Sequence, residues 1–149
     1  MNTKPILRRT SRSLPIALLK ARETVMGPIR IMLNETGISE QKWRVIRVLD
    51  EAGPMEQTSL AHSACLLLPS LTRMLRSMEE EELISRATDP ADGRKSIVRV
   101  TDKGRQILRN HAGASEALSS DLEARFGKER LESLLDLLEA LNNTPLMPR

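Results

Sequence analysis

The sequence predicts a mainly α-helical fold with one small β-hairpin in its second half. Apolar residues recur at steps of three and four along most of the 149-residue chain, which is the period of amphipathic helices. Two short helical segments joined by a tight turn occupy the middle of the chain, and two short segments of alternating polarity follow them. Aromatic residues make up only 1% of the chain, so its core must consist mainly of Leu, Ile, Val and Met, which suits packing between helices.

Length, charge and composition restrict the class of protein. We expect a single domain over residues 1–149, with a formal net charge of +3 and basic residues clustered near the N-terminus. One cysteine excludes an internal disulfide, and two distant histidines predict no metal site and no cofactor. No apolar run approaches the roughly 20 residues of a membrane span, and the N-terminus lacks the apolar core of a signal peptide. A cytoplasmic protein is therefore expected.

The N-terminal third predicts a basic arm followed by two helices. Residues 1–10 are polar and basic, as in a flexible arm. Residues 12–36 form a helix that Ser13 caps, and Gly27-Pro28 should kink it because Pro28 has no N–H to donate. Ser39 caps a second helix, whose buried face carries Val45, Ile46 and Leu49 and which ends at a Gly-Pro pair.

The next segment has the pattern of a helix-turn-helix. Residues 58–64 form a short helix, residues 65–68 a turn, and Pro69 begins a second helix. That helix places Leu71, Leu75 and Met78 on one face, and its other faces carry Ser70, Thr72, Arg73, Arg76 and Ser77. A small polar and basic outer face is typical of a recognition helix that enters the major groove of DNA.

A charged hairpin follows the recognition helix. Residues 83–88 and 96–100 alternate in polarity like strands, and a turn-rich segment from Asp89 to Lys95 joins them. Arg94 at the tip can enter the minor groove, where narrow A·T tracts concentrate negative potential. Asp92 cannot favourably contact phosphate, so we expect it to orient Arg94. Residues 39–101 together predict a winged helix-turn-helix lobe.

The C-terminal third predicts two further helices. Thr101 caps the first, which runs to about Arg125, and Gly127 separates it from the second. The last helix carries an apolar stripe too wide for a free surface helix, made of Leu131, Leu134, Leu135, Leu138 and Leu141. We expect residues 12–36 and 102–142 to be dimerisation helices, because two recognition helices must lie about 34 Å apart. An intramolecular helical hairpin is the alternative.

Several motifs resemble those of the MarR family of bacterial transcription regulators. They are Leu60-Ala61, Leu68-Pro69-Ser70-Leu71-Thr72-Arg73, Leu83-Ile84, Arg86, Asp89-Pro90-Ala91-Asp92-Gly93-Arg94 and Val100-Thr101-Asp102-Lys103-Gly104. An Asp-x-Arg wing followed by a strand and Thr-x-x-Gly is specific in this order, and the resemblance covers nearly all of the chain. One departure is Glu82, where the family usually has a glycine in a left-handed turn. A glutamate in that conformation costs about 1 kcal/mol.

Further segments resemble those family members that control homoprotocatechuate and hydroxyphenylacetate degradation. These segments are residues 16–23, 41–49 and 65–72. The resemblance implies a repressor of an aromatic-compound catabolic operon, released from double-stranded operator DNA by a small aromatic carboxylate. An anionic aromatic ligand needs a cation, a hydrogen-bonding group and apolar walls.

These arguments select two sets of candidate residues. The expected DNA-binding residues are Ser70, Thr72, Arg73, Arg76, Ser77, Arg86, Asp92, Arg94 and Lys95, with Arg86 and Lys95 serving as phosphate contacts or hairpin supports. The expected ligand-binding residues are Ser13, Arg22, Trp43, Arg44 and His62, Ser13 coming from the other subunit of a homodimer.

Other functions compete with this interpretation. An enzyme is disfavoured, because the sequence has no phosphate-binding glycine loop, no paired metal ligands and no nucleophile–base set. A DNA-binding regulator without an effector and a protein-interaction module share much of the same pattern. Cys65 predicts a buried, inert thiol, with a redox-sensing regulator as the alternative. The sequence does not reveal the operator sequence or the identity of the effector. It also does not reveal whether DNA binding represses or activates transcription.

Overall fold

The computed structural model describes residues 3–147 and confirms the mainly α fold with a small β-wing. Its elements in chain order are the 3₁₀ helix η1 (Thr10–Arg12), α1 (Leu14–Asn34), α2 (Glu40–Ala52), β1 (Met55–Glu56), α3 (Gln57–Ser63), α4 (Leu68–Glu80), β2 (Ile84–Thr88), β3 (Ser96–Val100), α5 (Asp102–Phe126) and α6 (Lys128–Asn142). The chain forms two compact units, which divide within α5 between His111 and Ala112.

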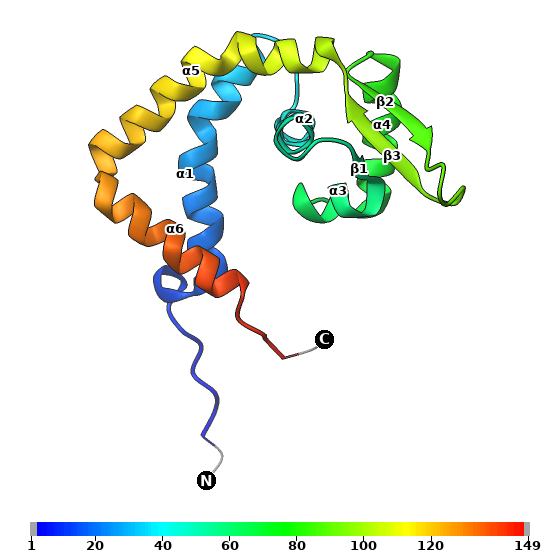
Figure 1. Cartoon of the computed structure of the whole chain (residues 1–149). Helices are drawn as coiled ribbons and strands as arrows, with labels where there is room; N and C mark the ends of the chain where they lie inside the picture. The colour runs from blue at the N-terminus through cyan, green and yellow to red at the C-terminus, as the bar shows by residue number, and fades with distance from the viewer. Residues whose placement is uncertain (1–2, 148–149) are drawn as a thin grey trace. The chain divides into compact units, whose positions relative to one another are not determined.

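The core of the first unit lies among α2, α3, α4 and the sheet, which Figure 1 shows together. Every apolar residue predicted to face inward on these helices is buried: Val45, Ile46, Leu49, Leu60, Ala61, Leu71, Leu75 and Met78. Helix α5 adds Ile107 and Leu108 at the edge of the same core. This packing fixes the outer face of α4, because Leu71, Leu75 and Met78 must point inward.

The sheet has three antiparallel strands in the order β1-β3-β2, one more than predicted. Strands β2 and β3 pair from Ile84 opposite Val100 to Thr88 opposite Ser96. The unpredicted strand β1 pairs Met55 with Val98, and at two residues it is too short to show alternation. It anchors the hairpin to the segment that leads into α3.

The turn after α4 takes the left-handed conformation in which the family usually has glycine. Glu82 has a φ of 62°. The backbone N–H of Leu83 donates to the Met78 carbonyl at 2.9 Å, and the Thr101 hydroxyl donates to the Glu82 carbonyl at 2.6 Å. These bonds stabilise the turn and offset the cost of about 1 kcal/mol of placing Glu82 in the left-handed conformation. Thr101 also caps α5 as predicted, since Gly104 N–H donates to its hydroxyl at 3.1 Å.

Three local predictions need correction. The Ser13 side chain makes no capping hydrogen bond, although Ser13 occupies the N-cap position of α1. Residues 10–12 form a 3₁₀ turn, which spans the last residue predicted as an arm and the first residue predicted as helix. Cys65 is exposed rather than buried, because its φ of 55° reverses the chain after α3 while the neighbouring Ala64 fills the core. Helix α1 includes Pro28, where the kink stays a prediction.

The second unit contains the rest of α5 and helix α6. No residue of α6 is buried, and its leucines include Leu134 at 41%, Leu135 at 50% and Leu137 at 69% exposure. The Arg130 guanidinium lies over the Phe126 ring at 4.5 Å, at the junction of the two helices. Of the leucine stripe, Leu134 and Leu135 are therefore exposed, whereas Leu131, Leu138 and Leu141 are half-buried. In residues 3–147 no helix is both long and apolar enough to cross a bilayer.

Candidate nucleic-acid interface

Helix α4 presents two basic side chains opposite its buried face. Arg73 and Arg76 are exposed, and Ser70 near the start of the helix is partly exposed. A helix turns by about 100° per residue, so Arg73 and Arg76 lie opposite Leu71 and Leu75. These positions suit contact with a base edge or a phosphate in the major groove.

Thr72 lies on the outer half of α4, but its hydroxyl is already engaged. The hydroxyl donates to the Leu68 carbonyl at 2.9 Å and accepts from Nε2 of Gln57, on α3, at 2.6 Å. A hydroxyl has one hydrogen, so Thr72 has none to donate to a base in this arrangement. The expected polar contact from Thr72 is therefore restricted to acceptance through its remaining lone pair.

Ser77 turns inward and is better described as a link between helices than as a DNA contact. Its hydroxyl accepts from Lys42 Nζ of α2 at 3.0 Å and donates to Glu81 Oε1 at 2.8 Å. Lys42 also pairs directly with Glu81. The sequence did not reveal these contacts, because Ser77 borders the apolar stripe of α4 on the side where α2 packs, and its DNA contact stays a prediction. The cluster Lys42–Ser77–Glu81 ties α2 to the end of the recognition helix.

This cluster predicts a loss of stability in acid. Hydrogen bonds from Lys42 and Ser77 lower the pKa of Glu81 from its usual value of 4.5. A lowered folded pKa adds stability above the unfolded pKa, which is lost as the pH falls through the folded pKa. We expect Glu81→Gln to reduce the free energy of unfolding by up to about 1 kcal/mol at pH 7, because the pair is partly exposed. Urea titrations should show this difference shrinking towards zero below pH 4.

Glu80→Gln is the matched control, since the exposed Glu80 adjoins Glu81 on α4 and lies outside the cluster. An equal pH-dependent loss in both variants would contradict the role of the Lys42–Glu81 pair.

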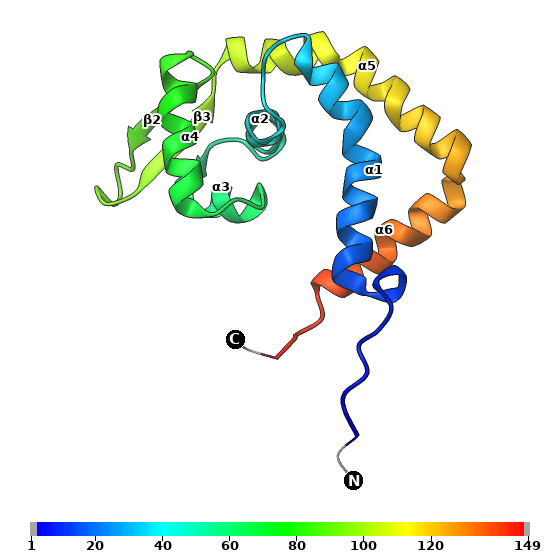
Figure 2. The same ribbon diagram turned by 180° about the vertical axis from the view of Figure 1, so that it is seen from behind.

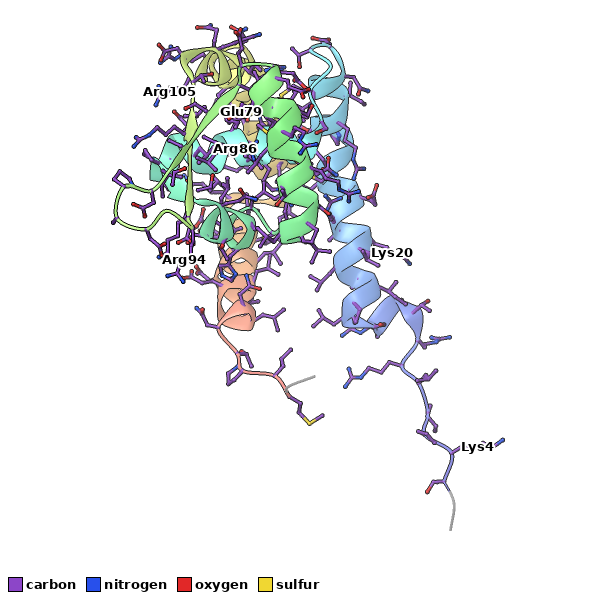
Figure 3. The ribbon with its side chains drawn as sticks, turned by 90° about the vertical axis from the view of Figure 1, so that its right-hand side faces the viewer. Lys4, Lys20, Glu79, Arg86, Arg94 and Arg105 are labelled. Carbon is purple, nitrogen blue, oxygen red and sulfur yellow. The ribbon has the colours of Figure 1, made fainter. Side chains whose placement is uncertain are left out.

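The tip of the β2–β3 hairpin carries the predicted Asp92–Arg94 ion pair. Arg94 Nε lies 3.1 Å from Asp92 Oδ1, Arg94 Nη2 lies 3.3 Å from Oδ2, and the Arg94 backbone N–H also donates to Oδ1. These donors hold the pKa of Asp92 below its usual value. The Arg94 side chain is nevertheless 91% exposed, and it extends from the end of the hairpin in Figure 3. Asp92 therefore positions a solvated guanidinium.

Arg86 and Lys95 support the hairpin in this structure. Arg86 Nη2 lies 3.3 Å from Glu79 Oε1 of α4, and the two side chains are labelled in Figure 3. Lys95 Nζ lies 3.8 Å from Glu56 Oε2 on β1. Arg86 and Lys95 were expected to be either phosphate contacts or hairpin supports, and these ion pairs correspond to hairpin support. The view from behind in Figure 2 shows the same hairpin extending past α4.

A separate cavity of about 270 Å³ lies between α1 and α2. It is lined by Arg22, Met26, Glu40, Trp43, Arg44, Arg47, Val48 and Glu51. Within the described residues, Trp43 Nε1 and Arg44 Nε are buried without a hydrogen-bond partner. Both atoms belong to residues that line the cavity, and buried polar atoms are rarely left unpaired.

Opposing charges line the same cavity. Arg22 Nη2 lies 2.9 Å from Glu40 Oε1, and Arg30 Nη2 lies 3.6 Å from the same oxygen. The hydrogen bond from Arg22 lowers the pKa of Glu40 more than burial raises it. The Arg47 guanidinium lies over the Trp43 ring at 5.2 Å. The cavity thus offers an aromatic wall, cations and a carboxylate.

The structure brings Arg22, Trp43 and Arg44 together and leaves the other two expected ligand residues outside this lining. His62 is exposed on α3, and Ser13 borders a different hollow formed by residues 7–16. Glu40 and Arg47 belong to the cavity and were missed. Their spacing of three and four residues from Trp43 on one helix was the available signal.

A two-helix motif with an exposed basic face, followed by a basic hairpin, defines the winged helix-turn-helix class of DNA-binding proteins. The sequence profile of the MarR family matches residues 38–96, which cover most of this lobe. The chain belongs to the MarR family, and it is a DNA-binding transcription regulator.

Relatives of known name extend this assignment. The homoprotocatechuate degradative operon repressor of Escherichia coli is 37% identical over 135 residues, covering 89% of this chain and 91% of the relative. The crystal structure of transcriptional regulator PA4135 matches with a TM-score of 0.85 and 41% identity, over 89% of this chain and 98% of that one. NadR in complex with 4-hydroxyphenylacetate matches with a TM-score of 0.79 and 33% identity, over 87% and 95%. The narrower resemblance predicted from the sequence is confirmed.

Proposed function

We propose that this protein is a homodimeric, cytoplasmic repressor of an operon for aromatic-acid breakdown, without catalytic activity of its own. It binds operator DNA through α4 and the β2–β3 wing, and an aromatic monocarboxylate in the α1–α2 cavity releases it. Two relatives support the ligand class: one is a homoprotocatechuate degradative operon repressor, and the other was crystallised with 4-hydroxyphenylacetate.

The observation that carries this proposal is one cavity lined by an aromatic ring and cations, in which two lining residues, Trp43 and Arg44, each have a buried N–H donor without a partner. A carboxylate and a phenolic oxygen accept such bonds. Three arginines and two glutamates line the cavity, which leaves it a net charge of +1. That charge complements a single carboxylate better than a neutral ligand or a dianion. A volume of about 270 Å³ suits a molecule with one aromatic ring.

Helix α2 provides a route from the cavity to the DNA-binding surface. It supplies Trp43 and Arg44 to the cavity and Lys42 to the end of α4. A ligand that shifts α2 therefore also shifts the recognition helix α4. In the dimer this changes the spacing between the two recognition helices, one from each subunit. Moving such an equilibrium from 99:1 to 1:99 requires about 5.5 kcal/mol of differential binding.

We assign dimerisation to residues 12–36 and 102–142. Three exposed leucines of α6, Leu134, Leu135 and Leu137, support this assignment, and so do the exposed apolar residues of α1, which include Leu14, Leu19 and Ile31. A dimer buries them and presents two wings to successive turns of the duplex.

The test is a fluorescence-anisotropy titration of the protein on the DNA upstream of its own gene, with and without 4-hydroxyphenylacetate and homoprotocatechuate. We expect nanomolar-class binding that either acid weakens at least tenfold. Tight binding that neither acid alters would favour a regulator without an effector. Turnover of either acid by the pure protein would overturn the regulator function.

The cavity itself is tested by Arg44→Met, which keeps the apolar stem and removes the buried donor. We expect the acid concentration needed for half-release of DNA to rise about tenfold or more, because a hydrogen bond to a charged group is lost. Binding to DNA without the acid should stay unchanged. His62→Ala is the control, since His62 is exposed and lies outside the cavity lining. An equal response of both variants would place the ligand elsewhere.

A further inference from the structure

Three consecutive leucines, residues 66–68, lie where α4 begins, and they differ in exposure. Leu66 packs against the core, whereas Leu67 is 77% exposed and Leu68 is 42% exposed. Pro69, the next residue, is also exposed. Leu67, Leu68 and Pro69 are thus consecutive exposed apolar residues at the start of α4, and contiguous exposed apolar groups are a feature of interaction sites.

The neighbouring Thr72 adds a methyl group to this surface. Its hydroxyl hydrogen is donated to the Leu68 carbonyl, and Gln57 donates to the same hydroxyl oxygen. These two bonds fix the rotamer and use the polar end of the side chain. Besides one remaining lone pair on its hydroxyl oxygen, Thr72 therefore has its γ-methyl left for a partner. Leu67, Leu68, Pro69 and Thr72 are called the apolar tip below.

We propose that the apolar tip binds the 5-methyl group of thymine in the major groove of the operator. This inference rests on the proposed DNA-binding function of α4. The thymine methyl is the one apolar group that a base pair presents at the major-groove edge, and aliphatic side chains recognise it. Arg73 and Arg76 lie on the same helix within two turns of the apolar tip, and their charge favours a polyanionic partner such as DNA. The tip thereby selects a thymine at one defined position of each half-site.

Replacing thymine with uracil tests the proposal, because uracil lacks only the 5-methyl group and keeps every hydrogen-bonding atom. The upstream DNA is prepared once with thymine and once with uracil throughout, and both duplexes are titrated with the full-length protein without effector. Burial of one methyl predicts about fourfold weaker binding per half-site, and so about tenfold or more for the dimer. Single uracil substitutions then locate the position.

Variants assign the effect to the apolar tip. Leu67→Ala should bind both duplexes with nearly equal affinity, and Thr72→Ser, which keeps both hydrogen bonds but lacks the methyl, should reduce the discrimination. Leu146→Ala is the control, because Leu146 has a similar exposure of 76% but follows α6. It should discriminate like the wild type.

The outcomes separate this inference from the function on which it rests. Equal wild-type affinity for both duplexes, or unchanged discrimination in Leu67→Ala, would overturn the thymine contact while leaving DNA binding established. Absence of sequence-specific binding to either duplex would overturn the proposed function and this inference together.

Discussion

Replacing Arg94 with alanine is expected to weaken operator binding about 10- to 100-fold and to leave the fold unchanged. The guanidinium stands at the end of the hairpin with 91% of the side chain exposed, so its removal disturbs no packed contact. Asp92 already holds it in one orientation, which reduces the entropy that DNA binding would otherwise have to overcome. A narrow minor groove attracts such a cation strongly, and the dimer loses two of them.

Anisotropy titrations at fixed salt concentration measure this loss, and thermal melts check that the fold is retained. Arg125→Ala is the matched control, because Arg125 is also exposed and paired with one carboxylate, Asp121, but lies on α5. Asp92→Asn should give a smaller loss, since Arg94 remains but is less well oriented. Wild-type affinity in Arg94→Ala would remove the wing from the binding mechanism.

The second large effect concerns stability. Gly104→Ala is expected to lower the free energy of unfolding by about 1–3 kcal/mol or more. A Cβ at this position would lie 2.5 Å from the backbone oxygen of Leu83 and 2.8 Å from a methyl group of Val100. The Leu83 oxygen cannot move easily, because it accepts the backbone hydrogen bond of Thr101 at 3.1 Å. The clash therefore forces α5 away from the hairpin.

Gly113→Ala provides the control on the same helix. No atom lies within 4 Å of a Cβ built at Gly113, so alanine should stabilise α5 by about 0.5–1 kcal/mol through its better helix propensity. Thermal melts of the two variants should shift in opposite directions, by about 2–4 °C per kcal/mol for a chain of this length. Equal shifts of the same sign would show that close packing at Gly104 does not decide the outcome.

Local sequence patterns determined most of the secondary structure. The three- and four-residue spacing of apolar residues predicted α2, α4 and α6 with their buried or apolar faces, because one face of each helix must be removed from water. The Asp92–Arg94 pair and the Thr101 cap were also predictable, since each joins residues only two or three positions apart. The order of these motifs was specific enough to identify the family.

Contacts between distant segments were decided only by the tertiary structure. Ser77 was expected on the DNA-facing side, but Lys42, 35 residues earlier, binds it from α2. Thr72 kept its place on the outer half of α4, yet Gln57 and Leu68 engage its hydroxyl and leave the methyl group. The cavity likewise depends on how α1 crosses α2, which brings Arg22 to Glu40. A sequence pattern shows which face of a helix is apolar, but packing between helices decides which polar atoms on the remaining faces are still available to a ligand.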